Sequence, residues 1–379
     1  METIQKNYLM ENKHLCKESY SNKKRNYGID LFKMLAHINI VILHFNLHSK
    51  LLNINHSSHK FKEIWCLEIL SFWGVDGFGL ISGFVGYKKH KFSNLLYIWI
   101  EVLFYSVFLS LILFFTKEIS YKEVIFSFFP ILIKRHWYVN AYIFMYLLLP
   151  FINEGIKNIN KTTFRNIIIF FVLFFSIYQT IAKIFRTNGF VFLNQGFSIF
   201  WLTVLYIIGA YIGKYEKNET KKSFCYFFAL SLIYFFLSFI TALVYFNMIK
   251  YKSHIPNNFL INYLSPTILF QAISLLLLFS KLNISNNYCQ KIINFFNPLN
   301  FSVILIHGRL FQTKNKLTKF LFNPIKNYNG NFTFLIIYLI SIAIYLICTL
   351  MDYVRLYFFN LLKIRYFCEL IFMTKKTIN

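Results

Sequence analysis

Five ionisable side chains recur within one apolar segment, residues 26–48. They are Asp30, Lys33, His37, His44 and His48. At 100° per residue of an α-helix, all of them fall within about 60° of one another and form one polar stripe. Carboxylates, amines and imidazoles can together bind an anion and move a proton. We therefore predict a membrane helix that turns this stripe toward the interior of a bundle and its apolar side toward lipid.

The stripe has two interpretations. Asp30 and Lys33 are three residues apart and could form an internal salt bridge that lowers the cost of placing both charges in a membrane. Alternatively, Lys33 presents its cation to an anionic ligand, such as the phosphates of a cofactor. His44 lies eleven residues further along the same face and is the stronger candidate for catalysis or proton transfer, whereas His37 and His48 are weaker candidates.

A second apolar segment, residues 65–87, contains Asp76 within a glycine-rich run, residues 74–83. Glycines allow close helix packing or a broken helix, but they do not explain a carboxyl group in the membrane. We expect this segment to line the same cavity as the first helix. Glu101, in the third segment, also needs a cationic partner, which could be Lys33 or a lysine of the basic loop between the second and third segments.

That basic loop contains Lys88, Lys89 and Lys91. Basic loops mark the cytoplasmic side of membrane proteins, and this loop could be such a signal or the rim of a phosphate-binding site. Two later regions could line a cavity for a second substrate. The first contains Trp137 and Asn140 next to His136, although aromatic and basic residues also gather at ordinary membrane interfaces. The second places His307 beside Arg309, on a helix that follows Asn297 and Pro298.

The composition defines the class of protein. Of 379 residues, 57% are hydrophobic, and the mean hydropathy of +0.49 is typical of a polytopic membrane protein. The net charge of +25 lies mainly between apolar segments, so we attribute it to topology and predict no nucleic-acid partner. The six cysteines are scattered, without metal-ligand spacing or a disulfide framework. We predict no metal site and no secretory signal ahead of the first segment.

The apolar segments predict an all-α bundle of about ten transmembrane helices with no soluble domain. The basic tails and the density of Lys and Arg in the loops favour cytoplasmic termini, in the cell membrane. Residues 1–25 form a polar cytoplasmic tail, 26–352 the bundle, and 353–379 an interfacial amphipathic helix with a tail. The ten segments are 28–47, 65–87, 95–115, 137–152, 166–184, 197–213, 223–247, 259–280, 296–312 and 332–352.

Four motifs in this order resemble the integral-membrane acyltransferase family 3, and within it the polysaccharide O-acetyltransferases. The chain contains Gly28-Ile29-Asp30-Leu31 followed by His44, and Gly74-Val75-Asp76 followed by Leu80-Ile81-Ser82-Gly83-Phe84. It also contains Trp137 followed by Ala141-Tyr142 and Leu149-Pro150-Phe151, and finally Leu305-Ile306-His307. The first helix keeps the family spacing between a cation and a histidine, but Lys33 replaces the family's arginine and keeps only its charge.

The resemblance implies a membrane enzyme that transfers an acetyl group from acetyl-CoA to a hydroxyl of a cell-surface or lipid-linked polysaccharide. Acetyl-CoA would dock from the cytoplasm near Lys33 and the loop of Lys88, Lys89 and Lys91. His44 would act as general base or accept the acetyl group transiently, with Asp30 and Asp76 orienting it or balancing charge. Trp137, Asn140, His307 and Arg309 would then bind the acceptor or stabilise the oxyanion.

Two other classes of function remain open. A proton-coupled transporter or flippase for a glycan or lipid-linked intermediate would also place Asp, Lys and His on one stripe, and would move its substrate without consuming acetyl-CoA. A glycan polymerase is also polytopic, but it predicts a large external loop, and no loop between the predicted segments exceeds about 25 residues. The absence of a phosphate-binding loop motif argues against an ATP-driven pump.

Overall fold

The polar stripe lies on α2 (Tyr27–His48). This helix begins at Asn26, whose side chain accepts a hydrogen bond from the Ile29 amide at 3.3 Å and donates one to the carbonyl of Ser280 at 2.7 Å. The computed structural model describes residues 25–54, 58–88, 90–132, 137–185, 187, 189–216, 222–248, 260–313, 316–328 and 330–373. Every regular element in these ranges is helical, which confirms the predicted all-α class.

Each of the ten predicted segments coincides with a helix or a pair of consecutive helices. Besides α2, these are α3 and α4 (His59–Ser71 and Trp73–Gly86), α5 (Phe92–Phe115), α7 (Trp137–Asn158), α8 and α9 (Lys161–Val172 and Tyr178–Ile184), α10 (Ile199–Tyr211), α12 (Phe224–Met248), α13 (Pro266–Lys281), α15 (Asn300–Gln312) and α17 (Thr333–Leu361). Shorter helices are α6 (Tyr121–Phe126), α14 (Asn287–Phe296), α16 (Lys316–Asn327) and α18 (Ile364–Met373).

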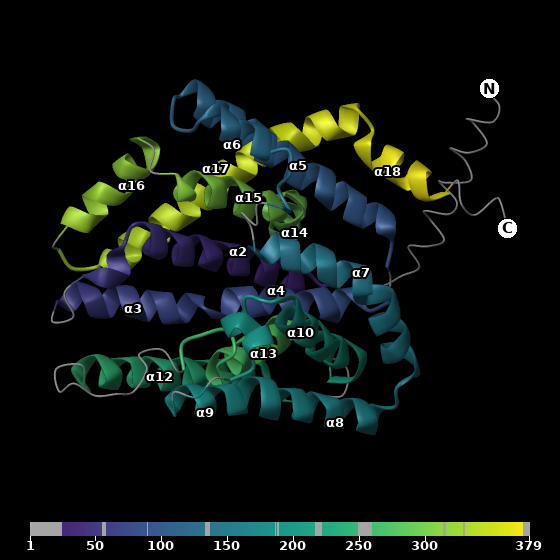
Figure 1. Cartoon of the computed structure of the whole chain (residues 1–379). Coiled ribbons are helices and arrows are strands. Elements are labelled where there is room, and N and C mark those ends of the chain that lie inside the picture. The colour runs from purple at the N-terminus through teal and green to yellow at the C-terminus, as the bar shows by residue number, and fades with distance from the viewer. Residues whose placement is uncertain are drawn as a thin grey trace.

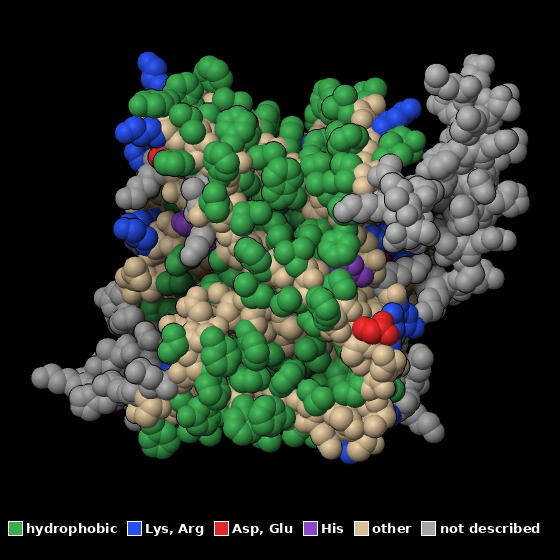
Figure 2. All heavy atoms as spheres, turned by 45° about the vertical axis from the view of Figure 1, so that its right-hand side comes forward, with side chains coloured by type: hydrophobic (Ala, Val, Ile, Leu, Met, Phe, Trp, Pro, Cys, Tyr) green, Lys and Arg blue, Asp and Glu red, His purple; other side chains and the backbone are tan. Residues whose placement is uncertain are grey.

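Within the described ranges, seven helical stretches are long and apolar enough to cross a bilayer. α13 is apolar but has only 16 residues, and α10 and α15 have 13 each. The chain is therefore a multi-pass membrane protein, whereas ten remains a predicted number of spans. The surface fits this class, because Phe115, Leu132 and Phe151 expose 78%, 77% and 80% of their area. Figure 2 shows hydrophobic side chains across the middle of one face, with Lys and Arg mostly toward its two lateral edges.

The bundle is organised around α2, α3 and α4, which form a central layer (Figure 1). In that view α5, α15 and α17 lie on one side of this layer, and α8, α9, α12 and α13 lie on the other. Figure 1 also shows α10 beside α4. A Cβ atom at Gly83 would lie 1.8 Å from the Tyr206 carbonyl oxygen, so a larger residue at this position would force α4 and α10 apart. The glycine-rich run of residues 74–83 is thus a continuous, closely packed helix.

α17 extends beyond the boundary that the sequence predicts at residue 352. It continues to Leu361, and Asp352 and Arg355 are buried at 0% and 3% exposure. Residues 353–361 therefore belong to the bundle, because Arg355 is neutralised inside it, and the separate terminal helix is α18. The Phe372 ring of α18 stacks on Phe92 of α5 at 6.1 Å, which places the end of α18 beside the start of α5.

Candidate active site

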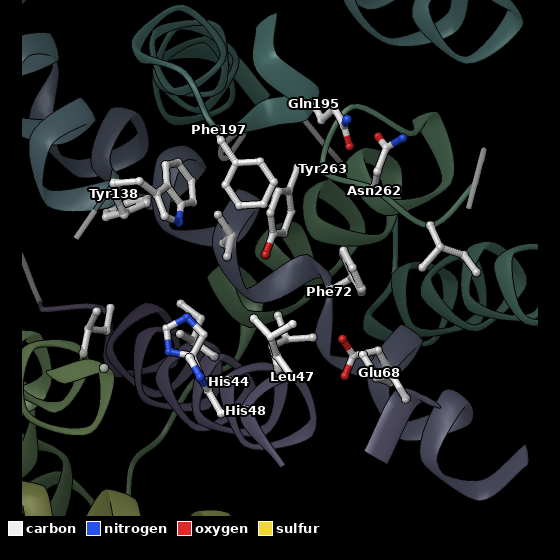
Figure 3. Close-up of a pocket in the computed structure, with 18 of the residues that line it drawn as sticks. His44, Leu47, His48, Glu68, Phe72, Tyr138, Gln195, Phe197, Asn262 and Tyr263 are labelled. Carbon is white, nitrogen blue, oxygen red and sulfur yellow. The ribbon is translucent and has the colours of Figure 1, made fainter. Parts of the chain in front are cut away.

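A pocket of about 530 Å³ lies at the end of the bundle where α2 and α15 end (Figure 3). The walls come from α2, α3, α4, α7 and α15 and from the segments just before α10 and α13. The pocket combines polar groups with aliphatic and aromatic side chains, and no Lys or Arg is among its described lining residues. Its size and composition are typical of a small-molecule site.

His44 lines this pocket and is hydrogen-bonded to His307 of α15. The His44 Nδ1 atom lies 2.9 Å from His307 Nε2, and His307 Nδ1 contacts the carbonyl oxygen of Val303. A carbonyl oxygen only accepts hydrogen bonds, so His307 Nδ1 carries a proton. In a neutral His307 the Nε2 atom is then an acceptor, and His44 must donate from its own Nδ1. The basic lone pair of neutral His44 therefore lies on Nε2.

Glu68 of α3 places a carboxylate at the same pocket. Its Oε2 atom accepts a hydrogen bond of 2.8 Å from Asn46 Nδ2 on α2, and the residue is 5% exposed. Figure 3 shows the carboxylate pointing into the cavity from the wall beside Phe72. Glu68 is not among the candidates predicted from the sequence, although a carboxyl group within a predicted membrane span is a signal of a functional site.

An aromatic wall faces His44 and His48 across the cavity. Trp137 contacts Phe197 edge to face at 4.8 Å between ring centroids, and Phe197 contacts Tyr263 in the same way at 5.2 Å. Figure 3 shows the hydroxyl of Tyr263 directed into the cavity. The Tyr263 phenol is neutral at physiological pH and can donate a hydrogen bond. Such flat rings can stack on the apolar face of a sugar while the hydroxyl binds its edge.

The structure separates the candidates for the second substrate into two groups. Trp137 and His307 belong to the pocket, the first as a lining residue and the second through its contact with His44. Asn140 donates to the Ile131 carbonyl at 3.0 Å, and Arg309 lies near Ser110 and Glu123 at 3.3 and 3.6 Å. Neither residue lines the pocket. His48 of α2 also lines the pocket. His136, which precedes α7 in the chain, lies outside the described residues.

At the other end of the stripe, Asp30 and Lys33 do not form the predicted internal salt bridge with each other. Asp30 Oδ2 accepts from Arg25 Nε at 2.6 Å, and Asp30 Oδ1 accepts from Asn297 Nδ2 at 3.0 Å. Lys33 is half-buried, and its ammonium group is attracted by Asp30 and Glu101 through space but forms no hydrogen bond or ion pair with another described residue. His37 is buried, with Nδ1 at 2.8 Å from the Lys33 carbonyl oxygen and its ring against Phe78.

Asp76 is completely buried and faces α10 rather than the cavity. The indole Nε1 of Trp201 donates to Asp76 Oδ1 at 3.2 Å, and Asp76 Oδ2 has no hydrogen-bond partner among the described residues. The adjacent Val75 lines the pocket. Asp76 therefore lies behind the pocket wall, where it links α4 to α10, and any effect on the reaction would pass through the packing of that wall.

The basic loop lies at the end of the bundle opposite the pocket, because it joins the end of α4 to the start of α5. Lys88 and Lys91 are exposed, and Lys89 lies outside the described residues. A smaller pocket of about 310 Å³, beside the start of α2, includes Arg25 and Lys281. Neither residue is among the candidates predicted from the sequence, because isolated cations at helix ends are common in membrane proteins.

Glu101 pairs with Arg355 rather than with Lys33 or a lysine of the basic loop. Arg355 lies 3.3 Å from Glu101 and forms two shorter bonds to Asp352, at 2.7 and 2.8 Å, while Ser302 donates to Glu101 at 2.6 Å. This satisfied buried network joins α5, α15 and α17. Its residues hold the helices together, and Glu101 is not a bonded partner of Lys33.

The sequence profile of acyltransferase family 3, described as an acyltransferase domain, matches residues 26–352. This range covers most of the chain, so the bundle with its histidine pair belongs to this family of membrane acyltransferases. No curated protein and no solved structure matches the chain. Among the described residues, no three His, Cys, Asp or Glu side chains are arranged to hold a metal ion.

Proposed function

We propose that this protein transfers an acetyl group from acetyl-CoA to a hydroxyl group of a cell-surface or lipid-linked polysaccharide. The observation that carries the proposal is the hydrogen-bonded chain from the Val303 carbonyl through His307 to His44, which leaves the basic nitrogen of His44 on Nε2. An acyltransferase needs a base at its acceptor hydroxyl, and the pocket that His44 lines has the aromatic and polar composition of a sugar site.

In the proposed reaction, His44 Nε2 removes the proton from the acceptor hydroxyl as the oxygen attacks the thioester carbonyl. The carbon–sulfur bond breaks, the acetyl group becomes an ester of the sugar, and coenzyme A leaves as a thiol after it takes up the proton. The imidazolium that forms at His44 donates a hydrogen bond from its Nδ1–H group to His307 Nε2, and this charge-assisted hydrogen bond stabilises the transition state. A transient acetyl group on His44 is the two-step variant of the same chemistry.

The acceptor side is supported by Glu68, Tyr263 and the aromatic wall. The Glu68 carboxylate can accept a hydrogen bond from one sugar hydroxyl and the neutral Tyr263 phenol can donate to another. Both interactions would orient the reactive hydroxyl toward His44. An orienting role of this kind lowers the barrier because the reactants are already positioned.

The donor side is supported by cations at the opposite end, which we place in the cytoplasm with both termini. Coenzyme A carries phosphates, and the half-buried Lys33 has no bonded carboxylate of its own among the described residues. Arg25, Lys281, Lys88, Lys89 and Lys91 supply further positive charge near this end. The thioester would reach from there toward His44, and the enzyme would act in the cell membrane, with acceptor on the outer side.

The test compares the wild type with His44→Gln in membranes of the host cell. Radiolabelled acetyl-CoA is supplied, and base-labile acetyl groups on the surface glycan are counted at equal protein level. We expect His44→Gln to lower the transfer rate by about 10²- to 10⁴-fold, the usual contribution of a general base. His59→Gln, which changes an exposed histidine, is the control. Equal labelling by His44→Gln and wild type would refute the proposal, and glycan transport without acetyl-CoA consumption would favour a transporter.

A further inference from the structure

Another pocket, of about 320 Å³, adjoins the His44 pocket and is called the second pocket below. Gln195 and Asn262 line both cavities and therefore stand at their junction. Figure 3 shows their two amide groups close together on the far side of the pocket from His44. The wall that separates the two cavities thus consists of groups that can bind a ligand passing from one to the other.

The turn that carries Gln195 is held in an unfavourable backbone conformation. Asn194, Gln195 and Gly196 have φ values of 42°, 55° and 96° in succession, which the first two residues rarely adopt. Asn194 stabilises the turn through its side chain and its carbonyl, which bind the backbone of Phe197 at 3.2 and 2.9 Å. A Cβ atom at Gly196 would lie 2.5 Å from Tyr263 Cβ, so the turn packs directly on the aromatic wall.

Asn262 is fixed from the opposite side of the junction. The side-chain Oδ1 atom of Asn262 accepts a hydrogen bond from the backbone N–H of Leu264 at 2.8 Å, and the backbone N–H of Asn262 donates to Ser265 Oγ at 3.1 Å. These bonds orient the side chain and occupy its oxygen. The Nδ2 group is a donor, which suits a sugar ring oxygen, a hydroxyl or the oxygen that links two sugars.

The second pocket is itself lined by polar groups. They include Gln179, Lys183 and Thr187 as well as Asn194. The Nε2 donor of Gln179 is buried and has no hydrogen-bond partner among the described residues. Gly189 lies so close that a Cβ there would be 2.0 Å from Gln179 Oε1, and this contact restricts the amide. A buried donor of this kind is costly unless a ligand or water satisfies it.

We propose that the acceptor is an oligosaccharide or longer chain that occupies both pockets, with one sugar unit beside His44 and the next in the pocket of Gln179. Gln195 and Asn262 bind the linkage between the two units. The inference rests on the proposed function, since it describes the acceptor of that reaction. It predicts that a single sugar unit is a poor acceptor, because it leaves the second pocket and its buried donor unsatisfied.

The experiment uses the surface glycan of the host, stripped of ester groups by mild base and hydrolysed to a ladder of one to six sugar units. Full-length protein in lipid nanodiscs receives labelled acetyl-CoA and one size fraction at a time. We expect kcat/KM to rise at least about tenfold from one unit to two, as for one added hydrogen-bonded contact set of ~1.4 kcal/mol. In Gln179→Met, which keeps side-chain volume and removes the amide, this ratio should fall toward one.

Gln271→Met is the matched control, because Gln271 of α13 is a buried glutamine and lines neither pocket. It should keep the wild-type ratio between two units and one. Equal kcat/KM for one and two units in the wild type would overturn the inference while leaving the proposed function intact. So would an unchanged ratio in Gln179→Met. Absence of transfer to every fraction would instead refute the proposed function, and the two-pocket acceptor with it.

A binding measurement separates occupancy from chemistry. Trp137 lines the His44 pocket, so its fluorescence should respond to sugar binding in the His44→Gln background, where transfer is lost. Two-unit fractions should bind more tightly than single units there, and Gln179→Met should remove the difference. Equal affinities for the two sizes would contradict the inference.

Discussion

His44 Nδ1 lies 2.9 Å from His307 Nε2, although 263 positions separate the two residues in the chain. The contact joins the ends of α2 and α15. A second contact, between Asp30 and Asn297 at 3.0 Å, joins α2 to the turn that precedes α15. The two helices are therefore aligned side by side, and this alignment sets the orientation of the imidazole that lines the pocket.

The histidine pair predicts a specific hierarchy of His307 variants. His307→Leu removes the acceptor of the His44 Nδ1 proton and should lower kcat by roughly 10- to 100-fold, the value of one hydrogen bond to a charged group at ~1.5–3 kcal/mol. His307→Gln can still accept that bond through its amide oxygen and should retain intermediate activity. Steady-state kinetics should show little change in KM for acetyl-CoA or for the glycan. An unchanged kcat in His307→Leu would contradict a catalytic role for the hydrogen bond between His44 and His307.

Lys33 offers a test of the donor site. Lys33→Met should raise KM for acetyl-CoA by roughly tenfold or more, because it removes a charged hydrogen bond to the donor. Lys33→Arg should retain activity, since the guanidinium keeps the charge and adds a bidentate geometry for phosphate. The control is Lys222→Met, a change of an exposed lysine. If Lys33→Met left KM for acetyl-CoA at its wild-type value, Lys33 would not bind the donor.

Glu68 offers a test of the acceptor site. Glu68→Gln preserves the shape of the side chain but weakens its hydrogen bond to a sugar hydroxyl, so KM for the glycan should rise by about five- to tenfold. KM for acetyl-CoA should stay constant. Glu154→Gln makes the same chemical change at an exposed position of α7 and should behave as wild type. Parallel increases in both KM values would indicate a general structural defect instead of a role in acceptor binding.

The contact of α4 with α10 predicts a large difference between two glycine substitutions. Gly83→Ala would place a Cβ atom 1.8 Å from a backbone oxygen and should destabilise the protein by about 1–3 kcal/mol. Gly155→Ala meets no atom within 4 Å and should be neutral or stabilising by up to about 1 kcal/mol. Thermal unfolding in detergent measures both. A Gly83→Ala protein as stable as Gly155→Ala would show that the helices can separate without cost.

The helices follow from local patterns, and this explains why their positions were predictable. Each predicted apolar segment became helical because a backbone in lipid must satisfy its own hydrogen bonds. The end of α17 was not predictable in this way. Arg355 looks like an interfacial cation in the sequence, and its burial became visible only once Asp352 and Glu101 surrounded it.

The sequence alone determined the class of protein and its family motifs, and it predicted His44 as the leading candidate for the base. Periodicity along one helix identifies which residues can share a face, and this is local information. Only the tertiary structure decided that Asp30 binds Arg25 and Asn297, that Asp76 binds Trp201, and that Arg309 turns away from the pocket. Gln195 and Asn262 had no sequence signal at all, since they come from segments 67 residues apart that meet only when α10 and α13 pack on α4.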